Sequence, residues 1–284
     1  MSDLNLIKEL REKTGAGFLD CKNALSENNN NIEQSIDALR KKGLAKATKK
    51  SSREANEGAV GFYKNENISV ILKINSETDF SAKSDTFLDF LDSIGKIALN
   101  TNNANLNLND FLKVKDNEKN IDDLLTEMIA KIGENLIIND FKVFDNKKTK
   151  INYYIHNPYR KNIGKIVSAV FYSSDEENDD VKNFTKNLCM HVAASKPEAM
   201  DIDKLPAELI ESEKKIQEEM IKDSGKPSNV MEKILEGKMK KFYSEVTLLN
   251  QNFVIDTDKT VKESISDFNL SNNLVLEDYI LISL

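Results

Sequence analysis

The sequence contains few of the residues that usually build catalytic or metal sites. Its 284 residues include only two cysteines and two histidines. Cys21 and Cys189 lie far apart, so no Cys-x-x-Cys pair is available for zinc. Neither histidine stands in a His-Glu-x-x-His motif. We therefore expect no metal site and no enzymatic activity, and we predict that both cysteines are buried as small apolar groups.

The two histidines have structural interpretations. His191 follows Cys189 on a predicted helix, where a core histidine hydrogen-bonded to the backbone is the simplest interpretation. His156 ends a predicted strand and precedes Asn157-Pro158, so we expect it at the surface. A surface position favours a contact with another molecule over catalysis.

Glycine-rich phosphate loops are also absent. Gly225-Lys226 has the end of such a loop, but Met220 stands where its first glycine is required. No Gly-x-Gly-x-x-Gly fingerprint occurs. We therefore expect the chain to bind no nucleotide and no other cofactor.

Long apolar runs are missing too, since none approaches the roughly 18 residues that cross a bilayer. The start, Met1 to Asn5, lacks the basic-then-apolar layout of a secretory signal, and we expect a cytoplasmic protein without membrane contact. Charged residues make up 31% and hydrophobic residues 39%, which is typical of folded chains. The length favours two compact units, with room for a smaller appendage.

The net charge of −7 argues against a general nucleic-acid binder, but the charge is uneven. Residues 1–55 hold eleven Lys or Arg and eight Asp or Glu, so this segment is +3 and the remainder −10. The basic excess is concentrated in one stretch without acids: Arg40, Lys41, Lys42, Lys46, Lys49, Lys50 and Arg53. It is interpreted either as a solvated helix face and linker or as an RNA or ribosome contact.

Residues 1–55 predict a small helical bundle followed by a basic linker. Ser2 or Asp3 can cap a first helix, and Gly43 suits the C-terminus of a third. Such a bundle resembles a ubiquitin-associated domain. Apolar residues recur at helical spacing in three groups: Leu4, Ile7 and Leu10; Phe18, Leu19, Cys21, Ala24 and Leu25; Ile32, Ile36 and Leu39.

The rest of the chain predicts an α+β core of two related subdomains, residues 56–139 and 140–284, each with an antiparallel sheet and helices. Expected strands are 59–63, 68–74, 136–144, 151–156, 163–171, 253–255 and 274–282. Expected helices are 87–98, 121–132, 181–194 and 259–268.

Residues 200–241 predict an antiparallel helical hairpin of coiled-coil type, inserted in the second subdomain. Ser224-Gly225-Lys226-Pro227 favours the turn between its helices. We expect two apolar stripes to be used up in packing against each other: Leu205, Leu209, Ile216 and Met220 on one helix, and Val230, Ile234, Leu235, Met239 and Phe242 on the other.

Three segments carry distinctive motifs. The first, Leu10 to Gly17, reads Leu-Arg-Glu-Lys-Thr-Gly-Ala-Gly and is followed by Asp20-Cys21-Lys22. The second, Ile74 to Ala82, reads Ile-Asn-Ser-Glu-Thr-Asp-Phe-Ser-Ala. The third, Met190 to Pro197, reads Met-His-Val-Ala-Ala-Ser-Lys-Pro. These segments resemble signatures of the bacterial elongation factor Ts family. Shorter matches at 131–135, 154–156 and 236–242 follow in the expected order. The resemblance extends from about residue 4 to about residue 280.

The resemblance implies a guanine nucleotide exchange factor rather than an enzyme. Such a protein binds elongation factor Tu and promotes release of GDP, so that GTP can reload, while GDP and magnesium are held by the partner. The Phe80 ring is implied to wedge between helices of the GTPase domain that support the magnesium and phosphate site. We expect the hairpin to be dispensable for exchange. The implied partner-binding residues are Arg11, Phe18, Leu19, Thr78, Asp79, Phe80, Ile132 and His156.

Some residues depart from the family pattern or allow a second interpretation. Ser81 replaces a usual valine, and Phe18 and Leu19 stand where paired methionines are common. The chain ends at Leu284, so we expect no contact from the further C-terminal helix that some members carry. On its own sequence, Phe80 is equally well interpreted as a core phenylalanine, with Asp79 capping the next helix.

Two other functions compete with exchange. One is an RNA- or ribosome-binding protein that uses residues 40–53. The other is a ubiquitin-associated adaptor, in which the first bundle alone binds a partner.

Overall fold

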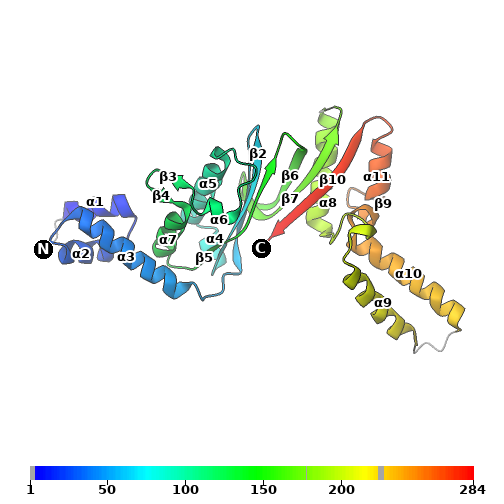
Figure 1. Cartoon of the computed structure of the whole chain (residues 1–284), viewed down its shortest axis with the longest axis horizontal. Coiled ribbons are helices and arrows are strands. Elements are labelled where there is room, and N and C mark those ends of the chain that lie inside the picture. Colours follow the sequence, from blue (N-terminus) through cyan, green and yellow to red (C-terminus); the bar gives the residue numbers. More distant parts are fainter. Residues whose placement is uncertain (1–3, 177, 223–226) are drawn as a thin grey trace. The chain divides into compact units, whose positions relative to one another are not determined.

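The computed structural model describes residues 4–176, 178–222 and 227–284, in which helices are combined with antiparallel strands as the predicted α+β class requires (Figure 1). The chain divides into two compact units. One comprises Met1–Lys147, Asn157–Ile166 and Ile282–Leu284, and the other Lys148–His156 and Val167–Leu281. The domain boundaries predicted after residues 55 and 139 stay a prediction. The cap at Ser2 or Asp3 and the turn at Ser224 to Lys226 lie outside the described residues.

The first unit begins with a bundle of α1 (Leu4–Thr14), α2 (Phe18–Glu27) and α3 (Ile32–Lys50). The side chain of Asn31 caps α3 by accepting a hydrogen bond from the Gln34 backbone N–H at 3.0 Å. Cys21 is buried, as predicted. The bundle has a small apolar core of its own, formed by Ile7, Leu10, Cys21, Ala24 and Leu25.

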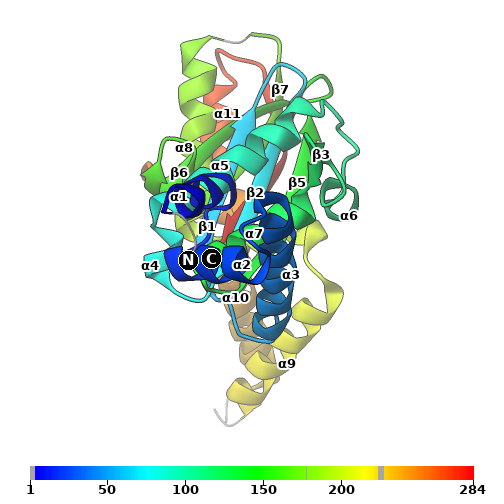
Figure 2. The same cartoon turned by 90° about the vertical axis from the view of Figure 1, so that its left-hand side faces the viewer.

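The prediction that Gly43 ends the third helix is wrong, because α3 continues to Lys50. A Cβ added at Gly43 would lie 3.3 Å from the Cβ of Ala130 in α7 (Ile121–Ile132). The glycine therefore serves a close approach of two helices, which lie side by side in Figure 2. Part of the predicted linker is consequently helical.

The core of the first unit is a sheet covered on one face by α5 (Asp85–Asn100) and α7. Its strands β1 (Glu57–Lys64), β2 (Ile68–Ser76) and β5 (Leu136–Asp145) are antiparallel, and β2 pairs with both others. Shorter elements are α4 (Asp79–Ala82), α6 (Leu108–Phe111), β3 (Lys115–Asp116) and β4 (Lys119–Asn120). Alternate residues of β2, namely Ile68, Val70, Leu72 and Ile74, point into the apolar core, as the period of a strand requires.

The second unit contains most of β6 (Lys150–Arg160), β7 (Ile163–Ser174) and β10 (Leu274–Ser283), in which β7 pairs with the other two. Its core also includes α8 (Asp179–Ser195), β8 (Asn252–Phe253), β9 (Asp256–Thr260) and α11 (Val261–Phe268). Val170, Tyr172, Leu188, Val192, Phe253 and Leu274 are among the residues of this core.

Two strand predictions in this region are wrong. β6 does not end at His156 but continues through Asn157, which adopts a left-handed φ of 48°, and through Pro158. The strand predicted at 253–255 stops at Phe253, and Val254 and Ile255 are exposed in the turn to β9.

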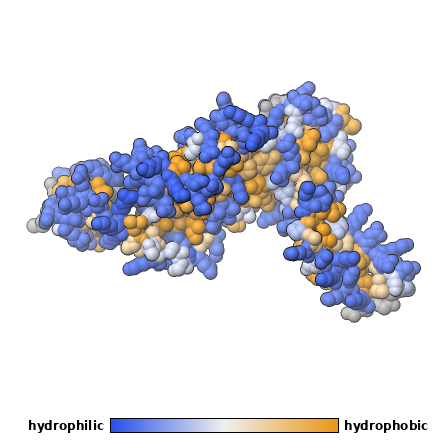
Figure 3. Space-filling model, viewed as in Figure 1, coloured by the Kyte–Doolittle hydropathy of each residue, from blue (hydrophilic) through white to orange (hydrophobic). Residues whose placement is uncertain are grey.

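The predicted hairpin is present as α9 (Ala207–Lys222) and α10 (Ser228–Val246), which pack against each other. The prediction that its apolar stripes are used up in packing is wrong for α9, because Leu209, Ile216 and Met220 are exposed. Ile221 is the buried residue of α9. Apolar residues are accordingly visible on the surface of the hairpin in Figure 3.

None of the helices in the described ranges combines the length and the apolar character that crossing a bilayer requires.

Candidate partner-binding surface

Thr78, Asp79 and Phe80 lie together where the chain leaves β2 and turns into the short helix α4. Thr78 caps this helix, since its side chain accepts a hydrogen bond from the Ser81 backbone N–H at 3.2 Å. Ser81 and Ala82, at the end of α4, are buried. The buried end fixes the turn, and the residues before it are directed outward.

The Glu134 carboxylate holds the turn from the other side. It accepts a hydrogen bond from the Thr78 backbone N–H at 3.0 Å and another from the Thr78 hydroxyl at 2.7 Å. Glu134 follows the end of α7 at Gly133, whose left-handed φ of 86° reverses the chain there. The sequence motif at 131–135 was noted for its resemblance alone. The feature that could have predicted its contact with Thr78 is a carboxylate placed just after a helix C-terminus.

A second set of contacts fixes the residue before Thr78. The Glu77 carboxylate accepts a hydrogen bond from the Asn135 backbone N–H at 2.7 Å, and mainly this bond lowers the pKa of Glu77. Asn135 in turn donates through Nδ2 to the Arg53 carbonyl at 2.8 Å. Sequence reasoning named Arg53 only as part of the basic stretch and Asn135 only within the motif at 131–135, because contacts between residues 58 and 82 positions apart leave no local pattern.

Phe80 itself projects into solvent and is 85% exposed. The interpretation of Phe80 as a core phenylalanine is therefore wrong. Asp79 does not cap a helix either, because Thr78 caps α4 and Ser84 caps α5. Asp79 instead forms an exposed ion pair with Lys83 at 2.7 Å, which lowers the pKa of Asp79.

Ser81, where the sequence departs from the expected valine, is buried at the end of α4. Its Oγ atom is buried and has no hydrogen-bond partner among the described residues. A hydroxyl in such a position gains nothing from burial, whereas a valine side chain would. The serine at position 81 therefore affects the packing under the turn at Thr78 to Phe80, which we call the tip. It leaves the exposed Phe80 ring unchanged.

The other predicted site residues lie in both units. Arg11 and Phe18 border one shallow groove between α1 and α2, and the neighbouring Leu19 is exposed. Ile132 is half-buried at the end of α7, two residues before Glu134. His156 belongs to the second unit, where its Nδ1 lies 3.2 Å from the Tyr154 hydroxyl.

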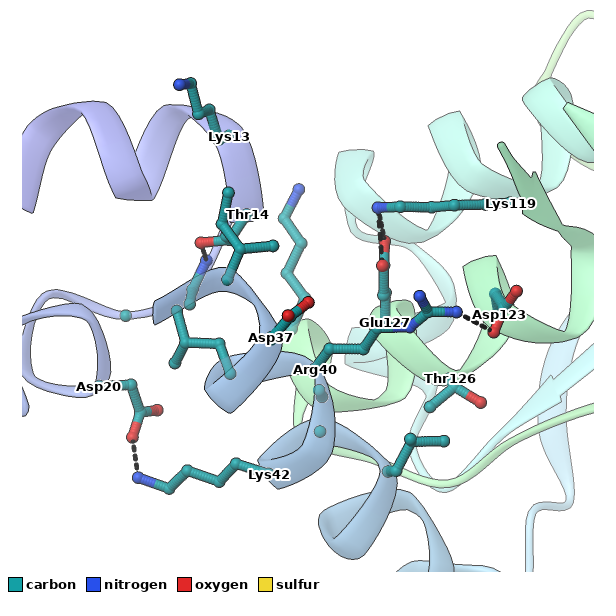
Figure 4. Close-up of a pocket in the computed structure, with 18 of the residues that line it drawn as sticks. Lys13, Thr14, Asp20, Asp37, Arg40, Lys42, Lys119, Asp123, Thr126 and Glu127 are labelled. Carbon is teal, nitrogen blue, oxygen red and sulfur yellow. Dashed lines mark hydrogen bonds and ion pairs between the residues drawn. The ribbon is translucent and has the colours of Figure 1, made fainter. Parts of the chain in front are cut away.

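Much of the basic stretch is engaged in contacts within the first unit. Arg40 reaches from α3 to Asp123 of α7 at 2.7 Å, and Lys42 reaches Asp20 of α2 at 2.7 Å (Figure 4). These pairs line a cleft of about 340 Å³ between the bundle and α7. Lys50 donates to the Gly133 carbonyl, and Arg53 pairs with Glu77 at 3.3 Å. Arg40, Lys50 and Arg53 thus tie the bundle to the core, whereas Lys42 pairs within the bundle.

The second unit contains a buried histidine with structural contacts. His191 Nδ1 accepts a hydrogen bond from the Val254 backbone N–H at 3.3 Å, so Nε2 carries the proton and donates to Gln251 Oε1 at 3.0 Å. Burial lowers the pKa of His191 and raises that of the buried Cys189 thiol. Nowhere among the described residues do three or more His, Cys, Asp or Glu side chains gather as a metal site would need.

Known proteins with similar sequences identify the family. A family model for elongation factor Ts matches residues 77–279. Elongation factor Ts of Ehrlichia ruminantium (strain Welgevonden) is 38% identical over 281 residues, which cover 98% of this chain and 96% of that protein. Elongation factor Ts of Rickettsia prowazekii (strain Madrid E) is 40% identical over 275 residues, or 94% and 87% of the two chains. Elongation factor Ts of Allorhizobium ampelinum is 38% identical over 262 residues.

These matches define the class of protein as that of translation elongation factors. The chain belongs to the elongation factor Ts family.

Proposed function

We propose that this chain is the guanine nucleotide exchange factor for elongation factor Tu, which it binds in the GDP form and from which it promotes release of GDP. GTP then reloads the partner. In this function the chain holds no nucleotide and catalyses no reaction of its own, and it acts in the cytoplasm, where translation takes place.

The physical requirement for exchange is differential binding. A factor that weakens the partner's hold on GDP must itself be bound more weakly when GDP is present, by the same factor. Its contacts must therefore favour a distorted, nucleotide-free partner. A rigid apolar group that enters the GTPase domain meets this requirement, since displacing the magnesium ion weakens phosphate binding.

The observation that carries the proposal is the 85% exposure of Phe80 on a turn fixed at both sides. The turn is held by the buried Ser81 and Ala82 and by the two hydrogen bonds to Glu134. A large apolar ring in water contributes little to folding and has much surface to bury in a partner. We propose Phe80 as the wedge, flanked by Thr78 and Asp79.

The remaining predicted residues are proposed as further contacts with the partner. We propose that Arg11, Phe18 and Leu19 form a second contact on the bundle, and that Ile132 and His156 contribute from the core. Exposure of Phe18 and Leu19 supports this proposal, because the small core of the bundle does not use them.

The alternative of RNA or ribosome binding requires free cations between residues 40 and 53. Arg40, Lys42, Lys50 and Arg53 all have partners within the first unit. These contacts leave fewer cations for phosphates, so they favour the interpretation of the basic stretch as a helix face and linker.

The decisive experiment measures release of fluorescent GDP from elongation factor Tu with the variant Phe80→Ala, beside a thermal melt. Truncating a buried interface aromatic typically costs about 2 kcal/mol or more, which slows exchange by on the order of twentyfold if it falls on the exchange step. The melt should stay close to that of the parent, because the exposed ring adds little to stability.

A matched control is available in Leu270→Ala, since Leu270 is also 85% exposed but lies after α11 in the second unit. Exchange with this variant should equal that of the parent. If Phe80→Ala melts normally and exchanges at the parent rate, the wedge role of Phe80 is wrong.

A further inference from the structure

The loop that anchors the tip also receives the end of the bundle. This loop, residues 133–135, connects α7 to β5. Its Glu134 carboxylate accepts hydrogen bonds from the backbone N–H and the hydroxyl of Thr78. It is also contacted by residues 50–53, which end α3 and lead toward β1, and which we call the linker. Loop, linker and tip all belong to the first unit.

The linker is bonded to both ends of the loop. Lys50 donates through Nζ to the Gly133 carbonyl. The Arg53 carbonyl accepts a hydrogen bond from Asn135 Nδ2 at 2.8 Å. The Arg53 N–H donates to the Lys50 carbonyl at 2.9 Å, so both contacts come from one short turn. The linker therefore docks on the loop as a unit.

A closed ring of contacts joins the linker to the residue before the tip. The Glu77 carboxylate accepts a hydrogen bond from the Asn135 backbone N–H at 2.7 Å and pairs with the Arg53 guanidinium at 3.3 Å. Because Asn135 also bonds to the Arg53 carbonyl, each of the three residues contacts the other two. Asn135 is only 2% exposed, and hydrogen bonds of a buried side chain are costly to break.

The loop is too short for its contacts with linker and tip to be independent. Successive Cα atoms stay about 3.8 Å apart across trans peptide bonds, so three residues shift together. Gly133 is bonded to the linker, Glu134 to the tip, and Asn135 to both the linker and Glu77. A displacement of the linker therefore moves the groups that hold Thr78. By linkage, ordering of the tip favours docking of the linker by the same factor.

We propose that Arg53, Glu77 and Asn135 are positioning residues, which make the order of the tip depend on docking of the bundle. Release of the linker takes the cation from Glu77 and the acceptor from Asn135, so the tip samples more conformations. The bundle thereby acts on Phe80 through the linker and the loop. The consequence for a partner rests on the proposed function, whereas the coupling within the chain does not.

Amide hydrogen exchange of the free full chain tests the coupling. The double variant Lys50→Met/Arg53→Met removes both cations of the linker without changing a residue of the loop or the tip. Hydrogen exchange at the N–H groups of Thr78 and Ser81 should rise about threefold or more. The melt should stay close to that of the parent, because both lost contacts are exposed.

The matched control is Arg40→Met/Lys42→Met. It removes two cations from the same basic stretch and changes the net charge equally, but their partners are Asp123 and Asp20 rather than groups at the loop. Hydrogen exchange at the tip should equal that of the parent in this control.

A second variant breaks the ring from the core. Asn135→Ala removes the bond to the Arg53 carbonyl and keeps the backbone N–H that donates to Glu77. Hydrogen exchange at the tip should again rise. Combined with the linker variant, the increase should be smaller than the product of the two separate factors, because both variants break the same ring.

Release of GDP from elongation factor Tu gives an independent measurement. The linker variant keeps every proposed contact residue, so the protein concentration for half-maximal release should change little. The maximum rate of GDP release should fall about threefold or more, because the tip is less ordered when it enters the partner.

Three outcomes would overturn the inference. Hydrogen exchange at the tip that is the same in the parent and the linker variant removes the coupling. An equal rise in the matched control assigns the effect to general loosening of the bundle. Fully multiplicative factors show that linker and Asn135 act independently. Faster hydrogen exchange at the tip with unchanged GDP release would instead retain the coupling and contradict the proposed function of the tip.

Discussion

Phe80 and Phe87 are seven residues apart and chemically identical, but the structure uses them in opposite ways. Phe87 is fully buried on α5, whereas Phe80 is among the most exposed apolar side chains described. Deleting a buried ring of this kind typically costs 3 to 5 kcal/mol of stability, roughly, while an exposed ring costs little. At the residue scale, exposure therefore separates the side chains available to a partner from those that maintain the fold.

His191 is the clearest residue whose chemistry serves folding. It is fully buried between Val254 and Gln251, and protonation of Nδ1 would replace its hydrogen bond from the Val254 N–H with two opposed donors. Gln251 also donates to the carbonyls of Ser195 and Glu245, so the histidine belongs to the network that joins α8 to the base of the hairpin.

We predict that stability falls as the pH is lowered through the ordinary histidine value of 6.5, because burial lowers the pKa of His191 in the folded state. Between the two pKa values the unfolded chain binds the proton and the folded chain does not. The contribution of neutral His191 to the free energy of unfolding is therefore complete above about pH 6.5 and declines below it. Urea unfolding between pH 7.5 and 5.5 measures the slope.

The matched control uses the other histidine. His191→Gln should be less stable than the parent at pH 7.5 and should flatten the slope, whereas His156→Gln should retain it. An unchanged slope in His191→Gln would assign the pH dependence to other groups.

At the scale of elements, α4 is a single turn whose position depends on its neighbours. A helix of four residues has no stability of its own, since it closes hardly any hydrogen bonds for the residues it orders. Its ends are instead fixed by burial of Ala82 and by the hydrogen bonds from Thr78 to Glu134. The exposed tip is thus preorganised, which limits the entropy that binding must supply.

We predict that Glu134→Ala loosens the tip without unfolding the protein. Loss of two hydrogen bonds to a carboxylate should cost about 1 to 3 kcal/mol and raise amide hydrogen exchange at Thr78 to Ser81. Release of GDP from elongation factor Tu should slow, although Phe80 is intact. Lys83→Ala, which removes only the exposed ion pair with Asp79, should leave amide protection unchanged. Equal protection in both variants would contradict a positioning role for Glu134.

At the scale of the whole molecule, the bundle combines its own core with a polar attachment. Its buried residues form a cluster separate from that of the main sheet, against which Ala47 of α3 packs. The attachment consists largely of ion pairs and hydrogen bonds, such as Arg40 with Asp123. Such contacts hold two parts together with little gain in stability, since exposed ion pairs contribute about 0 to 1 kcal/mol.

We predict that removal of residues 1–55 weakens the complex with elongation factor Tu more than it destabilises the remaining chain. The loss of binding follows from the proposed contacts of Arg11, Phe18 and Leu19. A shorter cut after residue 51 retains Arg53, whose carbonyl accepts the bond from Asn135, and should melt higher than the longer cut. Calorimetric titration and thermal melts measure both effects. If both truncated chains melt far below the parent, the bundle is structural.

The sequence by itself determined most elements of this protein. Helices such as α5 and α7 and the hairpin of β1 and β2 follow from local periodicity, because an amphipathic segment has one face to bury wherever it packs. The family followed from motifs that are short but ordered along the whole chain. Element ends were less certain, as Gly43 and His156 illustrate, since the packing that extends α3 and β6 beyond them is not local.

Only the tertiary structure decided which apolar residues are covered. Phe80, Met220 and Ile221 are all large apolar residues on helices, but only Ile221 is buried. Burial depends on what packs against each helix, and that is set by segments distant in sequence. The same reason explains the Glu134 anchor, which joins residues 56 positions apart. Contacts between distant segments also explain why Arg40 and Lys42 of α3 are paired, although the sequence shows only a run of basic residues without acids.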